Sequence, residues 1–242
     1  MKFLFPDWPA PRNVRALSTL REGGCSQGVY RSLNLAAHVG DDSAHVSENR
    51  ARLRAAAALP SDPIWLKQVH GTNVLDDATA AADVEADGFY ARGSNRVCAV
   101  LTADCLPIAI CNRQGTEVGL LHGGWRGLSS GIVEAGLHAF RSPADELMAW
   151  LGPAIGAQAY EVGGEVREAF VAHDADAVSA FEPGRPGKWT MNIYRLASRR
   201  LSACGVTAIY GGEYCTATQA NLFFSYRRDG TTGRMASLVW LA

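Results

Sequence analysis

Two histidines and one cysteine occupy positions in the sequence that suit chemistry. His70, Cys105 and His122 each follow an apolar run typical of a buried strand, and each has glycine or proline within two positions after it. Strand ends are where α/β enzymes place functional side chains, since a rigid sheet holds them at a crevice. His70 and Cys105 are 35 residues apart, and Cys105 and His122 are 17 apart. These spacings are too long for a zinc finger, so the three side chains would have to converge through the fold.

Two imidazoles and one thiolate form a ligand set that suits zinc. Three protein ligands leave the fourth position of a tetrahedral site to water or substrate, which is the catalytic arrangement. Zinc lowers the pKa of a bound water to about 7 and so supplies hydroxide at neutral pH. From the spacing alone, two other interpretations stay open. The residues serve only packing and hydrogen bonding, or Cys105 is a nucleophile that His122 activates without a metal.

The elements that must position these residues alternate between strands and helices. We expect strands at 14–20, 64–69, 97–102, 106–111, 118–121, 148–151, 206–210 and 236–241, and helices at 43–58, 132–140, 164–173 and 193–204. Ser43 is the expected N-cap of the first helix. Hairpins interrupt the alternation, which predicts mixed rather than purely parallel sheets. No low-complexity linker divides the chain, so we predict one domain over residues 1–242.

Several motifs recur in a fixed order along nearly the whole chain. They are YRSLNL at 30–35, NR at 49–50, KQVHG at 67–71, ADG at 86–88, LTADCLP at 101–107, HGGWRG at 122–127, LGPAIG at 151–156, YEVG at 160–163, FSYRR at 224–228 and TGR at 232–234. This set resembles the YfiH-like family, whose members are also called multicopper polyphenol oxidase, laccase-domain protein or peptidoglycan editing factor. The resemblance implies an α/β fold of the α+β type, a layered α/β/β/α sandwich with mixed sheets. It also implies one zinc ion per chain, held by His70, Cys105 and His122, with copper a less suitable metal.

The resemblance implies purine nucleoside chemistry first. This means phosphorolysis of adenosine, inosine, guanosine or methylthioadenosine, and deamination of adenosine, with a nucleoside and phosphate as the small-molecule partners. A zinc amidase that edits UDP-muramoyl precursors of peptidoglycan is an alternative. Copper-dependent phenol oxidation is another, but six histidines in all are too few for a multicopper centre. A binding module with a structural metal would need a fourth protein ligand.

Polar residues beside the proposed ligands are candidates for catalysis and binding. Asp104 adjoins Cys105 and is interpreted as a carboxylate that moves protons, with turn capping as the alternative. Arg126, in the turn after His122, either clamps an anion or braces the turn. The remaining candidates resemble residues of the family's substrate pocket and are Asn34, Arg50, Gln68 and Arg227. Asp87 is interpreted as a turn residue.

Composition limits the partners that we expect. The net charge is −1 and there is no basic stripe, so a nucleic-acid partner is not expected. The first apolar run stops at Pro6 and Asp7, and no apolar run approaches the ~18 residues of a membrane helix. We therefore expect a cytoplasmic protein without a membrane partner. The six cysteines contain no CxxC pair and are expected to be free thiols.

Overall fold

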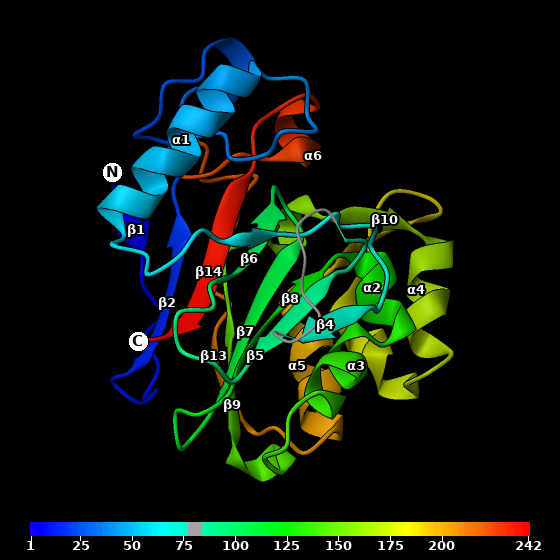
Figure 1. Cartoon of the computed structure of the whole chain (residues 1–242). Helices are drawn as coiled ribbons and strands as arrows, with labels where there is room; N and C mark the ends of the chain where they lie inside the picture. The colour runs from blue at the N-terminus through cyan, green and yellow to red at the C-terminus, as the bar shows by residue number, and fades with distance from the viewer. Residues whose placement is uncertain (77–83) are drawn as a thin grey trace.

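The computed structural model describes residues 1–76 and 84–242. Two β-sheets form the centre of the molecule (Figure 1). The five-stranded sheet has the order β1 (Phe3–Leu4), β2 (Val14–Thr19), β14 (Met235–Leu241), β6 (Cys98–Thr102) and β3 (Ile64–Trp65). All its pairs are antiparallel except β3 with β6. The sheet is therefore mixed, as predicted.

The six-stranded sheet carries much of the buried apolar sequence. Its order is β13 (Ala208–Gly211), β9 (Leu147–Leu151), β7 (Leu106–Asn112), β8 (Val118–Gly123), β5 (Gly88–Ala91) and β4 (Val74–Asp76). The two outer pairs are parallel and the inner ones antiparallel. Every residue of β7, β8 and β9 is buried, which explains their nearly unbroken apolar runs.

Helices cover the outer faces of the two sheets. Helix α1 (Ser43–Ala56) packs on the five-stranded sheet, on the left of Figure 1, and the other side carries α2 (Trp125–Ser130), α3 (Ile132–His138), α4 (Gly164–Val171) and α5 (Ile193–Ala203). A small antiparallel sheet of β10 (Glu161–Gly163), β12 (Lys188–Met191) and β11 (Phe181–Pro183) lies beside α4. Short 3-10 turns lie at Gly28–Tyr30, Ala144–Glu146, Ala157–Ala159 and Ala175–Ala180, and α6 (Tyr226–Asp229) precedes β14. Among the described residues, no helix is long and apolar enough to span a bilayer.

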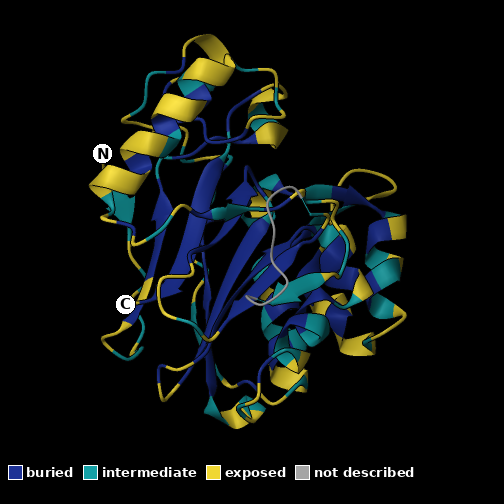
Figure 2. Ribbon diagram, in the orientation of Figure 1, coloured by how far each residue is buried: buried dark blue, intermediate teal, exposed yellow. Residues whose placement is uncertain are grey.

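Three main hydrophobic clusters lie between these layers. Phe89 and Trp150 belong to the cluster between the two sheets, Leu53 and Leu238 to the one under α1, and Leu201 to the one under α2–α5. Figure 2 shows the buried strands at the centre and the exposed outer faces of the helices. The predicted α/β/β/α sandwich is confirmed.

Some local predictions were wrong. Asp42, not Ser43, caps α1, because its carboxylate accepts the Ala44 N–H at 2.7 Å. His122 lies within β8 rather than after it. The strand expected at 64–69 ends at Trp65 and continues only as a bridge from Lys67 to Glu85.

Candidate metal site

His70, Cys105 and His122 converge although they come from separate segments. His70 lies in the loop after β3, Cys105 in the turn between β6 and β7, and His122 near the end of β8. Their ligand atoms all lie within 4.8 Å of one another. The Cys105 Sγ is 3.8 Å from His70 Nε2. Tetrahedral zinc with ordinary bond lengths sets sulfur and nitrogen ligands about 3.6 Å apart, so the donor set and spacing fit such an ion.

Asp87 is the buried anchor of this site. Its Oδ1 accepts hydrogen bonds from the His70 N–H at 2.9 Å and from His122 Nδ1 at 2.7 Å. Its Oδ2 accepts from the N–H groups of Val69 at 3.1 Å and Gly71 at 2.6 Å. One carboxylate therefore fixes the His70 loop and the His122 ring together. With a proton on Nδ1, His122 presents the lone pair of Nε2, as a metal-ligating histidine must.

The electrostatics of the cluster favour a thiolate at Cys105. Burial opposes ionisation of this half-buried thiol, but the charges of His122 and His70 and their hydrogen bonds outweigh it and lower the Cys105 pKa to about 6. Burial likewise opposes protonation of His122, but the Cys105 thiolate and Asp87 raise the His122 pKa. A thiolate is the form that binds a metal or attacks an electrophile.

The backbone around the candidate ligands adopts conformations and close contacts that few residue types tolerate. His70 has φ 60° and Asp104 has φ 99°, both in the left-handed region that side chains rarely adopt. Such conformations persist only where the surroundings hold them, and they gather at functional sites. A Cβ on Gly124 would come within 2.6 Å of His70 Cδ2 and 3.3 Å of Cys105 Sγ. Glycine at position 124 therefore lets the start of α2 approach the ligands closely.

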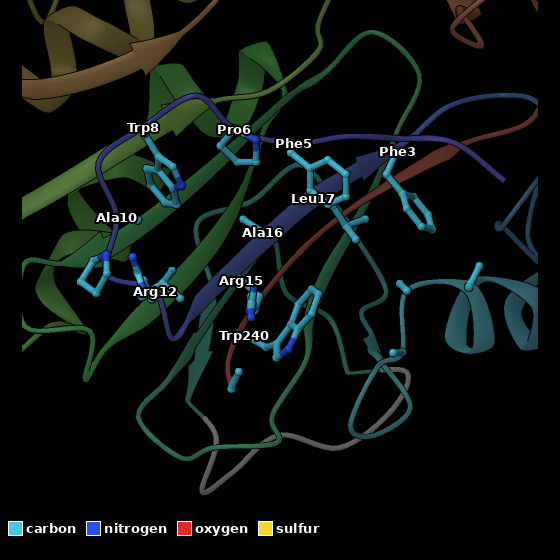
Figure 3. A pocket seen from close by; sticks show the side chains of 16 residues that line it. Phe3, Phe5, Pro6, Trp8, Ala10, Arg12, Arg15, Ala16, Leu17 and Trp240 are labelled. Atoms are coloured by element: carbon cyan, nitrogen blue, oxygen red, sulfur yellow. The ribbon is translucent and has the colours of Figure 1, made fainter.

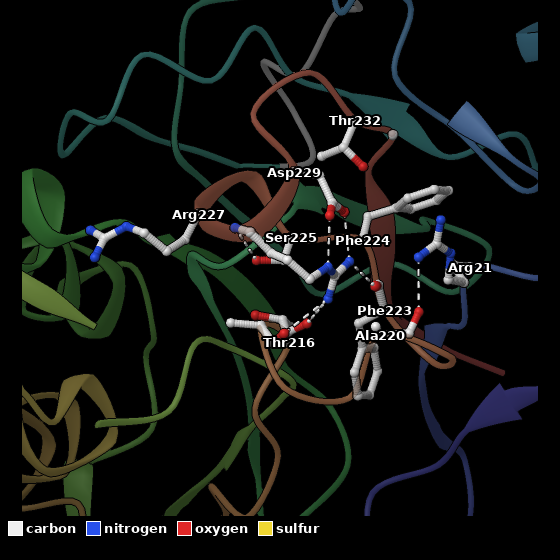
Figure 4. Close-up of polar contacts among 12 residues, drawn as sticks. Arg21, Thr216, Ala220, Phe223, Phe224, Ser225, Arg227, Asp229 and Thr232 are labelled. Carbon is white, nitrogen blue, oxygen red and sulfur yellow. Dashed lines mark hydrogen bonds and ion pairs between the residues drawn. The ribbon is translucent and has the colours of Figure 1, made fainter. Parts of the chain in front are cut away.

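Asp104 ties the ligand turn to the C-terminal segment. Its Oδ1 accepts from Thr216 Oγ1 at 2.6 Å, and its Oδ2 accepts from the Arg227 N–H at 2.7 Å. Arg228 braces the same segment, since its guanidinium pairs with Asp229 and donates to the carbonyls of residues 216, 217 and 223 (Figure 4). Each Asp104 oxygen thus has one partner inside the protein, so a role in proton transfer stays a prediction.

A cavity of about 250 Å³ opens onto the three candidate ligands. Its other lining residues are His38, Gln68, Leu101, Thr102, Ala103, Tyr226 and Arg234. The volume is just below the range of about 300–1,000 Å³ that is typical of small-molecule sites. Gln68 lines the cavity, and its amide donates to the Leu101 carbonyl at 2.9 Å and accepts the Leu101 N–H at 2.7 Å, so its role in substrate binding stays a prediction. Gln68 therefore holds the edge of β6 at the cavity wall.

The other predicted binding residues lie outside this lining. Asn34 is buried and accepts the Arg234 N–H at 3.0 Å, which fixes the backbone behind the cavity. Arg50 lies over the Trp65 ring and donates to a main-chain carbonyl. Arg126 is exposed and lies over its neighbour Trp125. Arg227 lies over the Tyr160 ring, and Figure 4 shows its side chain pointing away from Thr216 and Asp229. Their roles in binding stay predictions.

A larger hollow, of about 680 Å³, lies elsewhere on the molecule. The N-terminal segment forms one side of it, with Phe3, Phe5 and Trp8 over β2 and Trp240 (Figure 3). None of the candidate site residues lines this hollow. Its wall is mainly apolar and carries neither histidine nor cysteine, so we place the chemistry at the smaller cavity.

Sequence reasoning missed four residues of the site. Asp87 was interpreted as a turn residue, yet it is fully buried and charged, and such residues are rare without a functional or structural partner. Its place between alanine and glycine gave no sign of the histidine that it contacts. His38, Tyr226 and Arg234 reach the cavity only through loop packing, and no spacing in the sequence predicts that convergence.

Comparison with known proteins gives a consistent result. Residues 15–242 match the family model described as multi-copper polyphenol oxidoreductase laccase. The chain is 53% identical to the purine nucleoside phosphorylase YfiH of Escherichia coli (strain K12), with 99% of each chain covered. It is 52% identical to a purine nucleoside phosphorylase of Pseudomonas aeruginosa, covering 99% of this chain and 98% of the relative.

Solved structures share the whole fold. A crystal structure of a Neisseria meningitidis protein superposes with a TM-score of 0.96 at 47% identity, covering 100% of this chain and 99% of the other. YlmD from Geobacillus stearothermophilus superposes with a TM-score of 0.89 at 30% identity, covering 100% and 96%. The sequence match and the shared architecture agree, and the chain belongs to the YfiH-like family.

Proposed function

We propose that this chain is a zinc-dependent purine nucleoside enzyme. It would cleave adenosine, inosine, guanosine or methylthioadenosine by phosphorolysis and would also deaminate adenosine. The relatives at 53% and 52% identity carry the name purine nucleoside phosphorylase, which supports the substrate class. The observation that carries the proposal is the group of His70, Cys105 and His122, whose donor atoms gather within 4.8 Å at the wall of a cavity.

The three residues would hold zinc, and each is suited to this by its surroundings. The His70 loop and the His122 ring are both fixed by Asp87, and the Cys105 pKa is low enough for a thiolate at neutral pH. When bound, zinc supplies Lewis-acid activation of water or of a substrate oxygen. The set resembles catalytic rather than structural zinc sites because three protein ligands are present, and within residues 1–76 and 84–242 it is the only such group.

The two reactions make different demands on the protein. In phosphorolysis a phosphate oxygen bonds to C1′ of the ribose, the C1′–N9 bond breaks, and the base leaves with that electron pair and takes up a proton. In deamination a water oxygen bonds to C6 and the C6–N6 bond breaks; one water proton leaves with ammonia, and the other ends on N1 of the product. Both need a group that carries a proton, for which we propose Asp104, beside Cys105 in the chain. Phosphorolysis alone needs a site for the anion.

Metal analysis joined to a substrate panel tests the proposal. The purified protein should hold about one zinc per chain, and Cys105→Ala should lose most of it. Zinc-loaded protein should release free base from nucleosides only with phosphate, and ammonia from adenosine without it. His122→Ala should abolish both reactions. A UDP-muramoyl-L-serine control tests the amidase alternative. Full zinc content in Cys105→Ala would show that the ligand assignment is wrong.

One arrangement favours a second candidate, a metal-free cysteine hydrolase. Asp87, His122 and Cys105 form a chain of carboxylate, imidazole and thiol, and the Cys105 pKa is lowered to about 6. Such a chain can activate a thiolate nucleophile. Chelation separates the two candidates. The zinc enzyme loses activity with its metal and regains it with added zinc, whereas the cysteine hydrolase keeps activity without metal and is inactivated by alkylation of Cys105.

A further inference from the structure

Arg234 is a cationic residue of the candidate cavity that has unused hydrogen-bond donors. Its Nη1 donates to the carbonyls of Thr232 at 2.8 Å and Gly233 at 3.0 Å. Within the described residues, its Nε and Nη2 have no hydrogen-bond partner and no carboxylate pairs with it. The side chain is half-buried and lines the same cavity as His70, Cys105 and His122. A half-buried guanidinium with free donors at the wall of a cavity is suited to a bidentate oxyanion.

The residues around Arg234 also favour the binding of an anion. His38 lies at the mouth of this cavity, and its pKa is lowered by burial and by the charges of Arg234 and Arg50. The Tyr226 ring lies 5.9 Å from the Arg234 guanidinium and forms another part of the wall. The lowered pKa favours the neutral imidazole of His38, which can still donate one N–H, so Arg234 supplies the positive charge on the side of the cavity that the two residues share. An anion bound there would offset the charge of Arg234.

The backbone behind Arg234 is held firmly. Its N–H donates to Asn34 Oδ1 at 3.0 Å, and its carbonyl accepts the Leu35 N–H at 3.3 Å. Asn34 in turn donates to Asp41 at 2.9 Å. These bonds fix the start of β14 before any ligand arrives, and a fixed site loses little entropy on binding. Asn34 therefore acts through Arg234 as a positioning residue.

We propose that Arg234, with His38, binds a tetrahedral oxyanion beside the candidate metal ligands: free phosphate, or the phosphoryl group of a sugar phosphate. The proposal rests on the proposed function, because phosphorolysis takes up phosphate and forms ribose 1-phosphate. It differs from the sequence expectation, which gave Arg126 as the anion clamp and placed Arg50 and Arg227 in the substrate pocket. Those three side chains lie outside the cavity lining, over the aromatic rings of Trp65, Trp125 and Tyr160.

Calorimetric titration with inorganic phosphate tests the site without turnover. Metal-free and zinc-loaded protein should both bind phosphate saturably, and Arg234→Gln should weaken binding about tenfold to hundredfold in both. The phosphate affinity of Arg234→Lys should fall between those of the wild type and Arg234→Gln, because lysine keeps the positive charge but cannot donate two parallel hydrogen bonds. Arg54→Gln is the matched control, since Arg54 pairs with Asp62 on the exposed surface. A parallel titration with ribose 1-phosphate shows whether the free or the esterified anion binds more tightly.

A second variant covers the case in which Arg234→Gln folds poorly. His38→Asn changes an exposed residue at the mouth and should weaken phosphate binding several-fold. Unchanged phosphate affinity in Arg234→Gln would overturn the proposal. So would binding that requires zinc and ignores both variants, because the metal would then be the anion site.

Kinetics separate this proposal from the proposed function. In Arg234→Gln the KM for phosphate should rise by a larger factor than the KM for adenosine in deamination. If phosphate binding depends on Arg234 and no nucleoside is cleaved, the anion site holds and the proposed function fails. If nucleosides are cleaved with a phosphate KM that does not depend on Arg234, the proposed function holds and the anion site fails.

Discussion

Replacing Asp87 by asparagine perturbs the candidate metal site at its centre. The carboxylate accepts four hydrogen bonds, from His122 Nδ1 and from the N–H groups of Val69, His70 and Gly71. An asparagine has one oxygen and one amide nitrogen, and the nitrogen can only donate. If the amide faces Val69 and Gly71, two N–H groups lose their acceptor. If it faces His122 instead, the His70 N–H loses its acceptor, and the imidazole must accept at Nδ1, which moves its proton to Nε2 and removes the ligand lone pair.

The hydrogen bonds of Asp87 determine how strongly Asp87→Asn should affect stability and metal binding. Leaving a fully buried donor without a partner costs about 1–3 kcal/mol, and because the Val69 and Gly71 N–H groups are only partly buried, the first orientation lowers the free energy of unfolding by about 1–3 kcal/mol in total. The second orientation weakens the metal, because losing the partner of a ligating histidine typically reduces metal affinity about 10–100-fold. That range corresponds to about 1.4–2.8 kcal/mol. We expect Asp87→Asn to show both losses, and zinc binding to fall at least tenfold.

Competition with a chromophoric chelator measures the zinc Kd, and thermal unfolding of the metal-free protein measures stability. Asp62→Asn is the matched control, since that carboxylate is 77% exposed and pairs with Arg54 at the surface. It should change neither quantity by more than the small amount typical of surface ion pairs. A zinc Kd in Asp87→Asn equal to that of the wild type would refute the argument that Asp87 sets the His122 tautomer.

Three further predictions concern the same structure. Gly124→Ala should weaken zinc binding at least tenfold, because the new Cβ would lie 2.6 Å from His70 Cδ2. The control is Gly164→Ala, whose Cβ would meet nothing within 4 Å and should leave zinc binding unchanged. Equal zinc affinities of the two variants would contradict this prediction. Zinc present at about a thousand times its Kd stabilises the folded chain, so removing it should lower Tm by about 10 °C without unfolding the protein. Calorimetry measures this shift, and complete unfolding on zinc removal would indicate a structural site. Burial opposes ionisation of Glu117, but hydrogen bonds from Ser142 and Tyr90 outweigh it and hold the Glu117 pKa below its ordinary value. The resulting stability is present above the unfolded pKa of about 4.3 and is lost as pH falls through the folded pKa. Glu117→Gln should therefore cost about 1–3 kcal/mol at pH 7 and less in acid, and a pH-independent difference in chemical denaturation would contradict the linkage.

Apolar runs made most of the fold predictable. The strands at β6, β7, β8, β9 and β14 and the helices α3, α4 and α5 lie within a few residues of their expected bounds. These elements are buried on one or both faces, so their hydrophobic pattern is strong. The short strands β10, β11 and β12 have only three or four residues each and depend on pairing rather than on local sequence. Such elements give too short a pattern to recognise.

The candidate site was predictable only in part, for a related reason. The apolar runs before His70, Cys105 and His122 left a metal site as one of several interpretations, and the resemblance to the family favoured it; the structure brings the three residues together. Asp87 precedes β5, a four-residue strand that the sequence pattern did not reveal. Arg234 reaches the cavity through the packing of the loop before β14 against Asn34, 200 residues away in sequence. Contacts of that kind follow from tertiary packing and leave no local trace.

The distribution of the three candidate ligands over both sheets has a consequence for assembly. His70 follows β3 of the five-stranded sheet, His122 belongs to β8 of the six-stranded sheet, and Cys105 lies in the crossing between the sheets. An ion at this place would join two layers that are otherwise held mainly by their shared apolar interior. It would bind tightly only after the layers have docked in register, so metal uptake would report the last stage of folding. Damage to the interior between the sheets would then release the ion before the chain as a whole comes apart.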